Sequence, residues 1–181
     1  MTYSVTKVIQ FCYGHRLLNY DGKCRYLHGH NGTVEIELGS ETLDARGMVR
    51  DFGEIKQVVQ AWIDRELDHK MLLCRRDPVI PVLQQMKEPV FLMDDNPTAE
   101  AIAKLIFTYT ASQGFPVTSV RLWETDRSVA TYHLVGARRR VTRSRGPIPP
   151  GADDADSAAR RGREGWRSGR TRRRRSTSTA A

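Results

Sequence analysis

The stretch that decides the fold lies at residues 24–38 and reads Cys-Arg-Tyr-Leu-His-Gly-His-Asn-Gly-Thr-Val-Glu-Ile-Glu-Leu. Its second half, Thr33 to Leu38, alternates between polar and aliphatic side chains, which is the period of a half-buried β-strand. Counting back along the same strand, His28 and His30 share the parity of Val34 and lie on its apolar face. The strand is therefore expected to carry two imidazoles toward the interior.

A third histidine lies upstream of this strand. Residues 3–11 alternate in part and predict another strand, and the same phase continues to His15. Three neutral imidazoles with an open fourth position are the usual ligand set of a catalytic zinc ion. We therefore take His15, His28 and His30 as candidate metal ligands. Cys24 adds a nucleophile or base beside them; the alternative is that its thiolate is a fourth ligand, which would close the site and make the zinc structural.

The rest of residues 1–135 predicts an α+β domain. Residues 52–67 and 96–114 have apolar side chains at helical spacing, and residues 117–124 and 129–135 predict two further strands. The predicted order is ββααββ, with both helices on one face of an antiparallel four-stranded sheet.

Local signals predict where the helices begin and end. Asp51 is the expected N-cap of the first helix and Asn96 that of the second, which Gly114 should terminate. Residues 70–95 contain three prolines, and we expect an irregular connection there with at most a short helix around residues 82–86.

Composition separates residues 136–181 from the domain. This segment contains 14 arginines and 4 acidic residues, whereas residues 1–135 are slightly acidic, so the net charge of +8 comes from the tail. We predict a disordered, arginine-rich tail, because it has too few apolar side chains to offset its ordering entropy. A nucleic-acid-binding arm is the less favoured interpretation, and a solvated extension the favoured one.

The sequence also indicates in which compartment of the cell the protein is expected. It contains no run of eighteen apolar residues, so no membrane span is expected, and its first residues lack the layout of a signal peptide. Three cysteines at irregular spacing favour reduced thiols in the cytoplasm over a disulfide framework.

Three further residues have both a chemical and a structural interpretation. Asp68 and His69 follow the first predicted helix, where a carboxylate could orient an imidazole for proton transfer; alternatively they are a solvated helix end. Glu124 shares the parity of the apolar residues of its strand, so an inward carboxylate could accept two N–H bonds from a guanidine-like ring edge. Alternatively, Glu124 turns to solvent and Trp123 points inward.

Six ordered motifs resemble the family of 6-pyruvoyltetrahydropterin and 6-carboxytetrahydropterin synthases over residues 3–134. They are Phe11-x3-His15-Arg16-Leu17, Cys24-x3-His28-Gly29-His30-Asn31, Met48-Val49-x-Asp51-Phe52, Leu67-Asp68-His69, Asn96-Pro97-Thr98-x-Glu100 and Trp123-Glu124-Thr125. The resemblance implies the tunnelling fold, in which the strands of neighbouring subunits join into a barrel and trimers stack into a homohexamer. The resemblance does not extend to the tail.

The resemblance also implies a role for each candidate residue. His15, His28 and His30 would bind Zn²⁺, and Cys24 would abstract a proton. Asp68 and His69 would complete the relay across a subunit interface, and Glu124 would anchor a pterin ring.

Within the family, the spacing favours one product. The gap of three residues between Cys24 and His28 is that of 6-carboxytetrahydropterin synthases of queuosine and other deazapurine pathways, whereas pyruvoyl-forming enzymes have a longer gap. Such a zinc-dependent lyase would convert dihydroneopterin triphosphate into carboxytetrahydropterin, acetaldehyde and triphosphate. The alternatives are a 6-pyruvoyltetrahydropterin synthase, which cleaves no carbon-carbon bond, and a non-enzymatic zinc module that binds nucleic acid through its tail.

Overall fold

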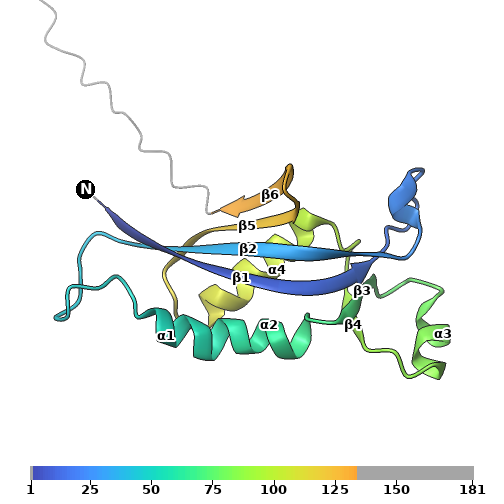
Figure 1. The fold of residues 1–181 in the computed structure, drawn as a ribbon, viewed down its shortest axis with the longest axis horizontal. Helices are drawn as coiled ribbons and strands as arrows, with labels where there is room; N and C mark the ends of the chain where they lie inside the picture. The colour runs from blue at the N-terminus through green and yellow to red at the C-terminus, as the bar shows by residue number, and fades with distance from the viewer. Residues whose placement is uncertain (1, 134–181) are drawn as a thin grey trace, which may run out of the picture. The chain divides into compact units, whose positions relative to one another are not determined.

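A computed structural model describes residues 2–133 of the chain, so the predicted domain boundary at residue 135 and the tail 136–181 lie outside the described residues. The elements are β1 (Tyr3–His15), η1 (Lys23–Arg25), β2 (His28–Ser40), α1 (Phe52–Ile55), the π-helical turn η2 (Lys56–Gln60), α2 (Ala61–Glu66), β3 (Lys70–Cys74), α3 (Ile80–Gln85), β4 (Val90–Met93), α4 (Ala99–Ser112), β5 (Val117–Thr125) and β6 (Ser128–His133). They form one six-stranded sheet in the order β4-β3-β1-β2-β5-β6, and α1, α2 and α4 lie on one side of it (Figure 1). The predicted α+β class is confirmed.

The long hairpin of β1 and β2 is the centre of the sheet. The two strands pair antiparallel along their whole length, from Tyr3 opposite Ser40 to His15 opposite His28. Alternate residues of both strands are buried against the helices, as Ile9 and its partner Val34 show. The predicted strand phases are confirmed, and both strands extend as far as the histidines.

The prediction of a four-stranded antiparallel sheet is wrong, because residues 70–95 are not an irregular connection. They contain β3, α3 and β4; β3 pairs parallel with β1, and β4 pairs parallel with β3, which makes the sheet mixed. Pro78 and Pro89 lie between these elements and Pro81 lies in the first turn of α3, so none of the three interrupts strand pairing. The short helix expected near residues 82–86 is present as α3.

The first helical segment follows the sequence prediction. Asp51 caps α1, since its side chain accepts a hydrogen bond of 2.7 Å from the amide of Gly53. The rings of Trp62 in α2 and Tyr109 in α4 stack with centroids 4.0 Å apart, which joins the two helices. The structure contains no helix within residues 2–133 that is long and apolar enough to cross a membrane.

The predicted N-cap of the second helix is wrong. Thr98, not Asn96, caps α4, with its side chain accepting from the amide of Ala101. Asn96 instead accepts a hydrogen bond from the amide of Leu18 and donates one to the carbonyl of Leu18, both at 2.9 Å. Asn96 therefore ties the loop after β1 to the segment before α4. The expected end of this helix is confirmed, because Gly114 follows it with φ of 79°, which favours glycine.

A buried ion pair holds the same loop from its other side. Arg16 directly follows β1 and donates two hydrogen bonds to Asp77, whose side chain is fully buried in the turn before α3. Burial alone would raise the pKa of Asp77, but the bonds from Arg16 and from the Val79 amide outweigh it and hold the pKa below its ordinary value. The carboxylate is therefore charged at neutral pH and depends on Arg16.

We predict that Arg16→Leu lowers the free energy of unfolding by about 3 kcal/mol at pH 7, because it leaves a buried carboxylate without its partner. The stability contributed by Asp77 is present above its ordinary pKa of 3.8 and is lost as pH falls through its lowered pKa. The difference in the free energy of unfolding between Arg16→Leu and the wild-type protein should therefore become smaller at acidic pH. Urea denaturation at fixed protein concentration, at pH 7 and well below pH 3.8, measures the free energy of unfolding of both proteins on either side of this range.

Arg75→Leu is the matched control. Arg75 pairs with Asp94 at 2.9 Å, but both side chains are exposed, and such pairs contribute little to stability. A similar loss in both variants, or an Arg16→Leu effect that does not change with pH, would contradict the role given to the buried pair.

Candidate metal centre and adjoining cleft

The β1–β2 register brings the three predicted metal ligands together. His15 lies opposite His28, and Tyr13 lies opposite His30. Directly opposed residues of an antiparallel pair project on the same side of the sheet. One nitrogen from each histidine can be chosen so that all three lie within 4.8 Å of one another; His15 is buried, and the other two rings are half-buried.

Hydrogen bonds determine which ring nitrogens face the centre of this group. Nδ1 of His15 lies 2.7 Å from the carbonyl oxygen of Pro97, and Nδ1 of His28 lies 2.7 Å from that of Tyr26. A carbonyl oxygen only accepts hydrogen bonds, so in the neutral rings Nδ1 carries the proton and Nε2 keeps its lone pair. Carbonyl bonds of this kind also orient histidines that bind metals.

The two Nε2 atoms of His15 and His28 are 3.0 Å apart. Two lone pairs at that distance repel each other unless a positive charge lies between them. A zinc ion bound by imidazole nitrogens at about 2.0–2.1 Å would supply that charge. The donor set and its orientation therefore fit a divalent metal ion.

Burial favours the ligand form of His15. Desolvation lowers the pKa of this ring, and the nearby His28 and His30 lower it further, while the bond to Pro97 and the charge of Glu124 act in the opposite direction. The net pKa is below the ordinary value of 6.5. His15 is thus neutral at pH 7, the state in which imidazole binds metals.

A cleft of about 340 Å³ adjoins the histidines. Cys24 of η1, His15 and Glu124 line it together with the start of α4 and part of β6. Cys24 has a free, half-buried thiol. It does not belong to the group of ligand atoms within 4.8 Å that the three histidines form. The geometry favours Cys24 as a neighbour of the metal centre over Cys24 as a closing fourth ligand.

Glu124 points inward. Its Oε1 accepts a hydrogen bond of 3.0 Å from the hydroxyl of Tyr13 and lies 3.9 Å from Nε2 of His15. The β5–β6 register shifts between Trp123 and Thr125, so an irregularity in the pairing falls at Glu124. Glu124 is the one acidic residue of β5, and its carboxylate lies beside His15.

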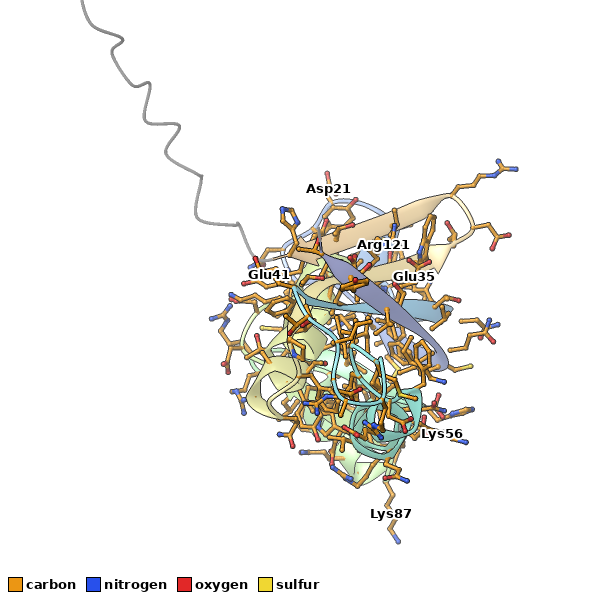
Figure 2. All side chains as sticks on the ribbon, turned by 90° about the vertical axis from the view of Figure 1, so that its left-hand side faces the viewer. Asp21, Glu35, Glu41, Lys56, Lys87 and Arg121 are labelled. Atoms are coloured by element: carbon orange, nitrogen blue, oxygen red, sulfur yellow. The ribbon has the colours of Figure 1, made fainter. Side chains whose placement is uncertain are left out.

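Trp123 belongs to the other face of the sheet, so the alternative that it replaces Glu124 inside is wrong. It pairs with Thr33 of β2, and its indole N–H donates to Glu35 at 3.2 Å. Glu35 also forms an ion pair with Arg121, and Figure 2 shows these two labelled side chains close together on neighbouring strands.

Tyr13 is a site residue that sequence reasoning missed. Its ring lies beside two of the histidines, with centroids 5.4 Å from His15 and 5.8 Å from His30, and its hydroxyl bonds to Glu124. Burial raises the pKa of its hydroxyl, and the charge and hydrogen bond of Glu124 raise it further, so the hydroxyl stays protonated and donates to the carboxylate. The strand parity placed Tyr13 in the interior but carried no signal of this bond.

Asp68 and His69 lie in the turn between α2 and β3, and they are bonded to each other. Nδ1 of His69 lies 2.7 Å from Oδ2 of Asp68. Neither residue lines the cleft that contains Cys24. His69 instead shares a separate cleft of about 570 Å³ with His28 and His30. Within one chain, the structure therefore does not bring the pair together with Cys24.

The arrangement combines a metal-binding group with proton-transfer groups. A metal held by three imidazoles would keep an open position for a substrate oxygen. A thiol and a carboxylate line the adjoining cleft, and a thiol can move protons once it is ionised. The site can therefore polarise a hydroxyl or carbonyl while a side chain moves a nearby proton.

Comparison with known proteins identifies the family of the chain. The family described as 6-pyruvoyl tetrahydropterin synthase matches residues 4–134. A curated relative, the 6-carboxy-5,6,7,8-tetrahydropterin synthase of Rickettsia bellii, is 37% identical over 127 residues, which cover 66% of this chain and 92% of the relative.

Solved structures match the fold. An uncharacterised protein from Wolinella succinogenes is 27% identical with a TM-score of 0.63, and the match covers 74% of this chain and 99% of that one. The 6-pyruvoyl tetrahydropterin synthase of Caenorhabditis elegans has a TM-score of 0.56 at 23% identity, covering 74% and 96% of the two chains, and shows likeness of fold alone.

We predict that His28→Ala abolishes retention of the first equivalent of zinc, because it removes one of three ligands. His133→Ala is the matched control, since His133 is an exposed residue of β6 outside the group. The two variants are dialysed against a weak chelator. Elemental mass spectrometry then measures the zinc content per chain of each. Equal zinc content in the two variants would contradict the assignment.

Proposed function

The chain belongs to the 6-pyruvoyl tetrahydropterin synthase family, and from this premise we propose that it is a 6-carboxy-5,6,7,8-tetrahydropterin synthase. Its substrates would be dihydroneopterin triphosphate and one water molecule from solvent, and its products carboxytetrahydropterin, acetaldehyde and triphosphate. The observation that carries the proposal is the relative of that name, matched over 92% of its length. The gap of three residues between Cys24 and His28 supports the same choice.

Zinc is the metal that best fits the histidine group. His15, His28 and His30 would hold it with the nitrogens that converge in the structure. When bound, the ion would act as a Lewis acid toward the hydroxyl oxygens of the substrate side chain. Because His15 and His28 already have their Nδ1 atoms bonded to carbonyls, their Nε2 atoms require no reorientation to bind.

Cys24 would move the protons of the substrate side chain. It lines the same cleft as His15 and Glu124, so a substrate held there would lie within reach of its sulfur. The thiolate is the reactive form, and a neighbouring cation favours it. Arg25 and Lys23 flank Cys24 in η1, and these residues also are candidates for contact with the triphosphate.

Glu124 would bind the guanidine-like edge of the pterin. A carboxylate can accept two parallel N–H bonds from such an edge. Tyr13 would act as a positioning residue, since its hydroxyl holds Oε1 of Glu124 and fixes the rotamer of the carboxylate. The ring would then lie in the cleft with its side chain directed toward the histidines.

Asp68 and His69 would serve the site of a neighbouring subunit. Asp68 accepts from Nδ1 of His69, which orients the imidazole for proton transfer. Within one chain the pair lies outside the cleft of Cys24, so a shared site requires assembly. The edge strands β4 and β6 of the described sheet leave backbone groups open for pairing with another copy. This supports the proposed barrel and homohexamer of the tunnelling fold.

The wider setting follows from the proposed reaction. A lyase that needs the free thiol of Cys24 suits a reducing compartment, and we place it in the cytoplasm. The product would enter queuosine or other deazapurine biosynthesis. Residues 1–135 would form the catalytic domain, and the arginine-rich residues 136–181 a dispensable extension rather than a nucleic-acid-binding arm.

We predict that the full chain, loaded with zinc and incubated with dihydroneopterin triphosphate, releases one acetaldehyde per carboxytetrahydropterin formed. Mass spectrometry identifies the pterin, and a coupled alcohol dehydrogenase assay measures acetaldehyde. Cys24→Ala should retain zinc and lose at least about a hundredfold in turnover, because it removes a group that transfers protons.

Cys74→Ala is the control for Cys24→Ala, since Cys74 is a buried free cysteine of β3 that does not line the cleft. Pyruvoyltetrahydropterin without acetaldehyde would identify the alternative synthase. Loss of zinc from Cys24→Ala would show that its thiolate is a ligand and would overturn the role proposed here.

A further inference from the structure

A second group of metal-binding side chains lies apart from the three histidines. It consists of Cys12 in β1 with Asp68 and His69 in the turn before β3, and one ligand atom from each can be chosen so that all three lie within 4.8 Å of one another. Because side chains alternate along a strand, Cys12 projects on the face opposite to Tyr13 and His15. The two groups share no ligand residue, although the cleft of about 570 Å³ beside His28 and His30 also reaches Cys12 and His69.

Backbone hydrogen bonds hold the two segments together. The amide of His69 donates to the carbonyl of Cys12 at 2.6 Å, and the amide of Cys12 donates to Oδ1 of Asp68 at 2.7 Å. His69 adopts a left-handed conformation with φ of 54°, which is costly for a residue with a side chain and persists only where the surroundings enforce it. The three donors are thus brought together before any ion binds.

The chemistry of the group suits a thiophilic divalent cation. Thiolate, imidazole and carboxylate are the three kinds of side chain that bind zinc, and a water molecule could complete a tetrahedron. The Cys12 thiol donates to the side-chain oxygen of Asn31 at 3.1 Å, and Nδ1–H of His69 donates to Oδ2 of Asp68 at 2.7 Å. An ion would displace the thiol proton of Cys12 to solvent, whereas a neutral His69 can bind through its unprotonated ring nitrogen. A cleft of about 490 Å³ lined by all three residues gives access from solvent.

We propose that Cys12, Asp68 and His69 form a second metal site, separate from the histidine centre, that binds Zn²⁺ or a similar thiophilic divalent cation. Binding itself does not depend on the proposed reaction. Its consequence rests on the proposed function: if Asp68 and His69 form the proton relay, an ion on them withholds the relay from the neighbouring active site. The chain would then need one metal ion per subunit and be inhibited by a second.

Cobalt(II) titration of the metal-free full chain tests this site without any measurement of turnover. A thiolate ligand gives a charge-transfer band in the near ultraviolet, which a site made of histidines alone lacks. We expect the band to develop with the second equivalent in wild type. It should be absent from Cys12→Ser, remain in Cys24→Ser, and require more than about tenfold more cobalt in His69→Ala.

Three results would overturn the proposal: no charge-transfer band in wild type, a band that persists in Cys12→Ser, or a band that disappears in Cys24→Ser. A second measurement needs no variant. Excess Zn²⁺ should slow alkylation of Cys12 by iodoacetamide, read by peptide mapping, and unchanged alkylation of Cys12 would also contradict the site. Failure of either experiment leaves the product assay for the proposed reaction unaffected, so the two proposals can fail separately.

Discussion

Two hydrogen bonds from histidine rings to backbone carbonyls are the constraint on which the rest of the site depends. Pro97 and Tyr26 accept the Nδ1 protons of His15 and His28, and the two Nε2 lone pairs then face each other at 3.0 Å. Neutral imidazoles held in this way repel each other until a cation binds. The protein scaffold, rather than the metal, therefore sets the orientation of these two ligands.

The carbonyls can do this only if their loops are fixed. Pro97 precedes α4, and Asn96 beside it is bonded to Leu18 in the loop after β1. Arg16 and Asp77 hold the start of the same loop against the turn before α3. The segment 70–95, which joins the sheet as β3 and β4, thus supports the histidine centre from a distance as well as extending the sheet.

Much of the site was predictable because strand parity is local. The alternation around Val34 placed His28 and His30 on the apolar face, and the phase of β1 did the same for His15. The strands β3 and β4 were missed because parallel strands have short continuous apolar runs, without the alternation that marks an exposed face. Asn96 and Tyr13 were misjudged or missed because their partners, Leu18 and Glu124, are distant in sequence. The approach of Cys12 to Asp68 and His69 likewise depends on the order of the strands.

X-ray absorption at the zinc edge, on protein loaded with one equivalent, measures the convergence of the imidazoles most directly. We predict a first shell of nitrogen and oxygen atoms only, at about 2.0–2.1 Å, with the outer-shell scattering of three imidazole rings. A sulfur atom at about 2.3 Å, or scattering from fewer than three imidazoles, would contradict a centre built from His15, His28 and His30 with Cys24 beside it.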